Sequence, residues 1–147
     1  MRAEWQADGG PIDGDELVAQ GIHYRAVDVR ESVYEPVMQA LKVEHGYVEQ
    51  DVVELRPETP GLDGLLAKFD GEHFHEEDEV RFVLEGEGVF DIRSRDDRWM
   101  RVVVSRGDLI IVPAGRHHRF ELTEARTIRC VRLFKDPSGW VAHYRAA

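Results

Sequence analysis

The sequence predicts a mainly β protein, folded as an antiparallel barrel of jelly-roll type with a few helices from its N-terminal side packed outside. From residue 72 onward, short runs rich in β-branched and apolar residues alternate with turn residues such as Gly86, Gly107 and Gly115. Six such runs at regular spacing are typical of a β-sandwich or barrel. The expected strands cover residues 80–84, 89–92, 100–104, 109–112, 119–122 and 127–134.

The N-terminal part of the chain shows a different pattern. Residues 1–12 are glycine-rich and have no clear periodicity, so we expect a loosely ordered lead-in to a short helix over residues 16–20. A longer helix is expected over residues 32–45. Its signals are a capping-box pair, apolar residues at every fourth position and a glycine stop, at Ser32, Glu35, Val33, Val37, Leu41 and Gly46.

A further helix is expected between Pro60 and Gly71. Its apolar residues form a single stripe, at Leu62, Leu65, Leu66 and Phe69. We interpret both long helices as elements that pack against the barrel.

The composition favours a single domain over residues 1–147. With 42% hydrophobic residues, a chain of 147 residues can close one core. It has no apolar run long enough for a membrane span and no secretory apolar segment at its start, which predicts a cytoplasmic protein. The net charge of -10 disfavours nucleic acid and membrane partners. Cys130 is the only cysteine, so an intramolecular disulfide is excluded.

A histidine pair begins the segment that can carry chemistry. Alternate side chains of an extended strand share a face, so His73, His75 and Glu79 can point the same way. Two imidazoles and a carboxylate suit Fe(II), Ni(II), Co(II) or Mn(II) better than a metal that prefers thiolates. The alternative is that the His-X-His pattern is accidental or exposed.

Two blocks of spaced residues favour the metal site. The matched positions are His73, His75, Glu79, Gly86, Gly107, Pro113, Gly115 and His118. This pair of blocks resembles the two sequence motifs of the cupin superfamily. The resemblance implies a jelly-roll barrel over residues 72–134 and adds His118 as the fourth metal ligand. Ala67 and Leu122 stand where the motifs have Gly and Asn, and neither is a ligand position.

Within the cupins, the chain from residue 32 to its end is similar to the acireductone dioxygenases of the methionine salvage pathway. The similarity rests on whole phrases, found at residues 73–82, 84–86, 46–47, 51–53, 112–115 and 132–134 and at Pro137, Gly139 and Trp140. Residue 119 is Arg, where that family usually has Trp directly after its fourth ligand.

This resemblance implies one Fe(II) or Ni(II) ion per chain and no organic cofactor. It also implies 1,2-dihydroxy-3-keto-5-methylthiopentene and O2 as substrates. The iron form would give a 2-keto acid and formate, and the nickel form an off-pathway set that includes carbon monoxide. Four protein ligands on an octahedral ion leave two adjacent positions free, which is the arrangement that a bidentate enediolate needs. We expect a monomer or a small homo-oligomer.

Two arginines and a phenylalanine are expected beside the metal. Arg81 has the strand parity of Glu79, and a buried arginine needs an anionic partner. That partner is either Glu79 or an anionic substrate, and we assign Arg81 and Glu79 as the catalytic pair. Phe120 shares the face of His118 and lines the substrate pocket or packs in the core. Arg132 is a second inward, substrate-binding arginine or forms a surface ion pair.

Two other functions remain open on the sequence alone. A cupin isomerase or decarboxylase could use the same metal as a Lewis acid without oxygen chemistry. A non-catalytic cupin that binds a small molecule is the second alternative. Oxygen consumption separates the dioxygenase from the first alternative, and the second gains support only if the metal is absent.

Overall fold

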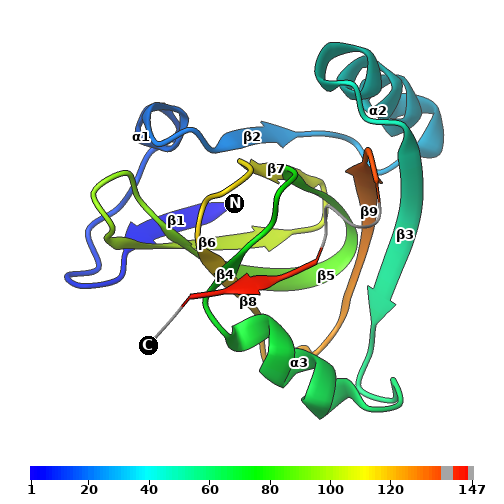
Figure 1. Ribbon diagram of the computed structural model, residues 1–147. Helices are drawn as coiled ribbons and strands as arrows, with labels where there is room; N and C mark the ends of the chain where they lie inside the picture. Colours follow the sequence, from blue (N-terminus) through cyan, green and yellow to red (C-terminus); the bar gives the residue numbers. More distant parts are fainter. Residues whose placement is uncertain (137–140, 146–147) are drawn as a thin grey trace.

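Strands make up most of the regular structure, with helices outside them (Figure 1). The computed structural model describes residues 1–136 and 141–145. The helices are α1 (Gly14–Ala19), α2 (Glu31–His45) and α3 (Leu62–Asp70). The strands are β1 (Arg2–Trp5), β2 (His23–Ala26), β3 (Glu49–Leu55), β4 (His73–Phe74), β5 (Glu79–Arg93), β6 (Trp99–Ser105), β7 (Asp108–Val112), β8 (His118–Leu122), β9 (Ile128–Phe134) and β10 (His143–Tyr144). The predicted mainly β barrel of cupin type is confirmed. Within the described residues, no helix is long and apolar enough to cross a membrane.

The long strand β5 joins the two halves of the barrel. Its first half pairs with β7 and β9, and its second half pairs with β6 and β8, all antiparallel. The change of partners comes at a register shift between Val83 and Glu85, followed by Gly86 with φ of 78°. A Cβ on Gly86 would lie 2.0 Å from the backbone oxygen of Thr127, so only glycine fits this corner. The predicted strands at 80–84 and 89–92 are therefore one element.

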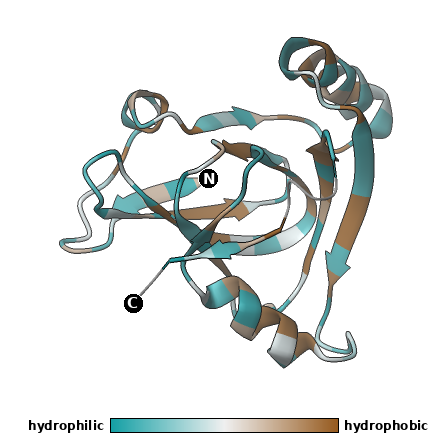
Figure 2. Cartoon of the chain, viewed as in Figure 1, coloured by the Kyte–Doolittle hydropathy of each residue, from teal (hydrophilic) through white to brown (hydrophobic). Residues whose placement is uncertain are grey.

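The side chains of β5 alternate between two apolar clusters. Val80, Phe82 and Leu84 belong to the cluster that packs against α2, where Met38 is fully buried. Val83 belongs to the larger cluster inside the barrel. Figure 2 shows most of the hydrophobic colouring on the strands around the barrel, while α2 and α3 show both colours. Both long helices therefore lie outside the barrel, as predicted.

The ends of the helices test the predicted caps. Gly46 ends α2 with φ of 77°, and its N–H donates to the carbonyl of Lys42 at 2.8 Å. The predicted capping box at Ser32 is wrong. The N-cap is Arg30, without a side-chain hydrogen bond, because the helix already begins at Glu31 and Ser32 lies inside the first turn.

The expectation of a loosely ordered lead-in over residues 1–12 is wrong. Strand β1 pairs along its whole length with β6, and Ala3 and Ile12 are both buried. The sequence carries no signal for this short strand because it contains polar residues and no local apolar run. The strand is stabilised by its pairing with β6. The short strands β2 and β10 and the polar edge strand β3 escaped sequence analysis for the same reason.

Candidate metal centre

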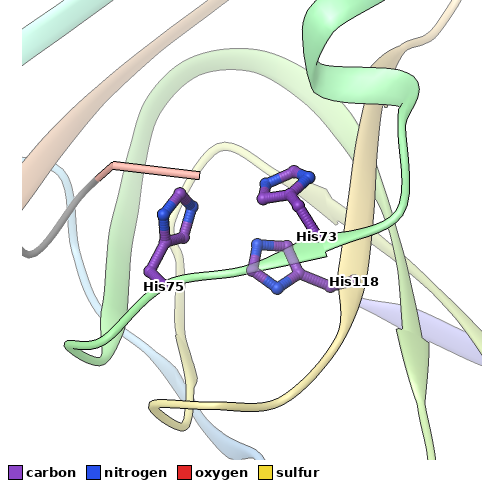
Figure 3. Close-up of side chains that lie close together, drawn as sticks. All are labelled: His73, His75 and His118. Atoms are coloured by element: carbon purple, nitrogen blue, oxygen red, sulfur yellow. The ribbon is translucent and has the colours of Figure 1, made fainter. Parts of the chain in front are cut away.

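Three histidine rings meet inside the barrel (Figure 3). His73 lies on β4 and pairs in register with His118, the first residue of β8. His75 follows β4 directly. The ring centroids lie 4.6 Å apart for His73 and His118, 4.9 Å for His73 and His75, and 5.3 Å for His75 and His118. Their candidate ligand atoms all lie within 4.8 Å of one another, so a single ion could contact all three.

Backbone carbonyls fix which nitrogen of each ring faces the centre. Nδ1 of His73 lies 2.6 Å from the oxygen of Gly71, and Nδ1 of His118 lies 2.9 Å from the oxygen of Arg116. Nδ1 of His75 lies 3.3 Å from the oxygen of Val141. A carbonyl can only accept, so each Nδ1 carries the proton and donates it. In the neutral ring this leaves Nε2 with a lone pair, as a metal ligand requires.

Glu79 adds a carboxylate to the three rings. It begins β5, and its Oε2 lies in direct contact with Nε2 of His118 and 3.9 Å from Nε2 of His75. Oε2 of Glu79 and Nε2 of His118 are buried, and neither has another hydrogen-bond partner in the described part of the chain. Burying polar atoms in this way is unfavourable unless something binds them. The donor set therefore fits a divalent transition metal.

The electrostatics of the cluster follow from its burial. Burial lowers the pKa of His73 and of His75, which keeps both rings neutral. Burial also disfavours a charged His118, but the adjacent carboxylate of Glu79 outweighs it and raises the pKa of His118. Burial alone would raise the pKa of Glu79, whereas His118, Arg81 and His75 together hold it below its usual range.

Arg81 lies on the same face of β5 as Glu79, as its parity predicted. Its Nε and Nη2 donate to Oε1 of Glu79 at 3.2 and 3.1 Å, and its Nη1 donates to Sγ of Cys130 at 3.4 Å. The side chain of Arg81 therefore pairs with Glu79 and also lines the adjoining cavity.

That cavity has a volume of about 290 Å³ and opens beside the metal cluster. Phe120 and Arg132 line it together with Arg81. Arg132 also forms a two-point ion pair with Asp51, with Nε–Oδ1 and Nη2–Oδ2 distances of 2.8 and 2.5 Å. The remaining lining residues that sequence analysis did not assign are Val53, Leu55, Lys68, Phe69, Ile128, Ala142 and Tyr144.

Phe69, one of these residues, and Arg119, which lies elsewhere, show where the sequence patterns stopped being informative. Phe69 belongs to the apolar stripe of α3 that we interpreted as packing, and its ring lies 6.3 Å from that of Phe120 in an edge contact. Nothing in the stripe distinguishes a cavity wall from a core. Arg119, the departure from the family's Trp, lies on the other face of β8, where its Nε donates to Asp91 at 2.9 Å and its guanidinium covers the ring of Trp99.

A β-barrel with three inward histidines and a carboxylate defines a metal-binding protein of cupin type. The sequence profile of the ARD/ARD' family matches residues 11–142, so the chain belongs to this family. Three residues that contribute to the similarity described above lie outside the described residues: Pro137, Gly139 and Trp140. Relatives of the chain are named acireductone dioxygenase, and the chain is an enzyme of that kind.

Individual relatives carry the same name. An acireductone dioxygenase of a Sulfurihydrogenibium species is 50% identical over 111 residues, which cover 76% of this chain and 62% of that relative. An acireductone dioxygenase of Dictyostelium discoideum is 43% identical over 130 residues, or 88% of each chain. A solved acireductone dioxygenase from Bacillus anthracis, with a cadmium ion in its active centre, superposes with a TM-score of 0.91 at 28% identity and 97% coverage of both chains.

Proposed function

We propose that this chain binds one Fe(II) or Ni(II) ion through His73, His75, Glu79 and His118 and uses O2 to cleave an acireductone. The observation that carries the proposal is the convergence of these side chains beside a cavity lined by two arginines. The names of the relatives supply the substrate class. The proposed substrate is 1,2-dihydroxy-3-keto-5-methylthiopentene, cleaved by the iron form to a 2-keto acid and formate in methionine salvage.

The donor set supports an ion of the Fe(II) or Ni(II) type. Three imidazoles and one carboxylate offer nitrogen and oxygen ligands, and Cys130, the only thiol, lies on Arg81 and not among the histidines. When bound, such an ion supplies Lewis acidity and a place for the substrate and O2 to meet.

The protein's own residues would bind and orient the substrate. Arg81 and Arg132 place two guanidinium groups on the cavity, where they can bind the negatively charged oxygens of an enediolate. Arg81 is held by Glu79, so its position is set before the substrate arrives. Phe120, which is buried, and Phe69, which is partly buried, supply an apolar wall for the substrate's tail and limit the access of water.

Metal analysis of freshly purified protein, paired with oxygen uptake on acireductone, tests the proposal. We expect about one ion per chain and oxygen consumption that depends on it. Reconstituted iron and nickel forms should differ in carbon monoxide release. Turnover of the substrate without oxygen consumption would instead indicate the isomerase or decarboxylase alternative. A metal-free protein that binds the substrate without turnover would indicate a non-catalytic cupin.

A further inference from the structure

The turn between two of the proposed metal ligands is fixed by a carboxylate that is not itself in the cluster. Asp78 precedes Glu79 in the chain, and both of its carboxylate oxygens accept hydrogen bonds. Oδ2 accepts from the hydroxyl of Tyr47 at 2.7 Å, and Oδ1 accepts from the backbone N–H of Ala114 at 2.9 Å. Asp78 therefore links the turn to two segments that are distant in sequence.

The second of these segments leads to His118. The N–H of Gly115 donates to the carbonyl of His75 at 2.9 Å, next to the bond from Ala114 to Asp78. Two hydrogen bonds thus join the loop that carries His75 and Glu79 to the loop that precedes His118. The relative position of the proposed ligands depends on this junction.

Tyr47 contacts this junction through its hydrogen bond to Asp78. It follows Gly46, the residue that ends α2, and only 4% of its surface is exposed. Its ring stacks on His45 with centroids 5.4 Å apart, and it belongs to the apolar cluster between α2 and the barrel. Burial raises the pKa of Tyr47, and the nearby carboxylate of Asp78 raises it further. The hydroxyl therefore keeps the proton that it donates.

We propose that the Tyr47–Asp78 hydrogen bond is a positioning contact that keeps the two ligand-bearing loops in register and thereby slows release of the metal. The inference rests on the proposed metal centre and adds residues that touch neither the metal nor the substrate. Groups that orient metal ligands from outside typically contribute 10- to 100-fold to metal affinity. The packed ring of Tyr47 transmits the rigidity of the α2 cluster to the loop of His75 and Glu79.

Tyr47→Phe is the direct test, because it removes the hydroxyl and keeps the buried ring. The matched control is Tyr24→Phe, since the hydroxyl of Tyr24 donates to Oδ1 of Asp108 at 2.8 Å and lies on β2, outside the metal centre. Each protein is loaded with one equivalent of Ni(II), and release of the ion to an excess of chelator is followed over time. Thermal unfolding of the metal-free proteins is measured in parallel.

We expect Tyr47→Phe to release Ni(II) about tenfold faster or more, and Tyr24→Phe to release it at the parent rate within about twofold. The two variants should lose similar thermal stability without metal, since each loses one hydrogen bond to a carboxylate. Asp78→Asn should also release Ni(II) faster, because its amide keeps an acceptor for Ala114 but replaces the carboxylate that Tyr47 binds.

Parent-like release from both Tyr47→Phe and Asp78→Asn would overturn the positioning role. So would equally fast release from Tyr24→Phe, because the effect would then follow general stability. If the parent protein itself takes up no Ni(II), the proposed metal centre fails, and this inference fails with it. The parent measurement therefore separates the two failures.

Discussion

Glu79 divides its two carboxylate oxygens between two kinds of partner. Oε1 accepts from the guanidinium of Arg81 at 3.1 and 3.2 Å, while Oε2 contacts Nε2 of His118. One side chain thus joins the proposed metal centre to the cation that faces the cavity. A change at Arg81 should therefore alter substrate binding and, more weakly, metal binding.

Arg81→Ala should fold and, at saturating metal, lose at least about tenfold in kcat/KM. A hydrogen bond to a charged group contributes about 1.5 to 3 kcal/mol, which corresponds to a loss of roughly ten- to a hundredfold. Arg81→Lys keeps the charge without the planar fork and should recover part of the activity. Steady-state kinetics on metal-saturated protein measures both. If Arg81 served only to pair with Glu79, turnover of the Ala variant would stay within about twofold of the parent.

Replacing His75 or His118 with Ala should abolish stoichiometric metal binding. Each variant removes one inward Nε2 and leaves the others unable to complete the coordination. His117→Ala is the matched control, because His117 neighbours His118 in the chain but its ring packs on Phe74 with centroids 5.2 Å apart. Elemental analysis after purification should show about one ion per chain for the control only. Unchanged metal content in the His75 and His118 variants would remove the proposed site.

Metal affinity should rise with pH because His118 must lose a proton before it binds an ion. Its pKa is raised in the metal-free protein, while those of His73 and His75 are lowered. The pair with Glu79 stabilises the metal-free fold fully below about pH 6.5, the ordinary histidine value, and this stability is lost as the pH rises through the raised pKa.

Ni(II) affinity and the thermal stability of metal-free protein, measured from about pH 6 to 8, check both trends. Affinity should increase over the range while metal-free stability decreases. Glu79→Gln removes the charge that holds the proton on His118, so it should flatten the decrease in stability. An affinity that does not vary with pH in the parent would contradict a protonated His118.

The sequence predicted which residues cluster better than it predicted how they are brought together. The parity argument placed His73, His75 and Glu79 on one continuous strand. In the structure the two histidines belong to β4 and its end, and a turn at residues 76–78 separates them from Glu79 at the start of β5. The side chains converge because β4 pairs with β8, where His73 lies opposite His118, and the start of β5 pairs with β7, where Glu79 lies opposite Val112. Such long-range pairing leaves no local pattern to read.

Helices and apolar strands were predictable because their signals are local. The stop of α2 at Gly46 and the runs of β6, β7 and β9 follow from neighbouring residues. The part of the cavity wall that comes from α3 and β10 was not predictable. Lys68 of α3 and Tyr144 of β10 meet there through tertiary contact, including a hydrogen bond from the Tyr144 hydroxyl to the carbonyl of Lys68 at 3.1 Å.

Gly88 makes room for the cavity wall. A Cβ at this position would lie 2.6 Å from Cε2 and 2.9 Å from Cζ of Phe120. Gly88→Ala should therefore displace the ring of Phe120, which lines the cavity. Overpacking of this kind costs about 1 to 3 kcal/mol of stability. We expect KM for acireductone to rise more than kcat falls, because the ring lies on the binding cavity and is not a metal ligand.

Gly64→Ala is the matched control for this change, since a Cβ there meets nothing within 4 Å and the residue lies inside α3. It should raise stability by about 0.5 to 1 kcal/mol and leave KM unchanged. Phe120→Leu in the Gly88→Ala background should restore part of the lost stability, because the smaller side chain removes the overlap. Thermal unfolding and steady-state kinetics of the four proteins decide the matter. A parent-like KM in Gly88→Ala would show that Phe120 does not shape the substrate site, since its displacement would then leave binding unaffected.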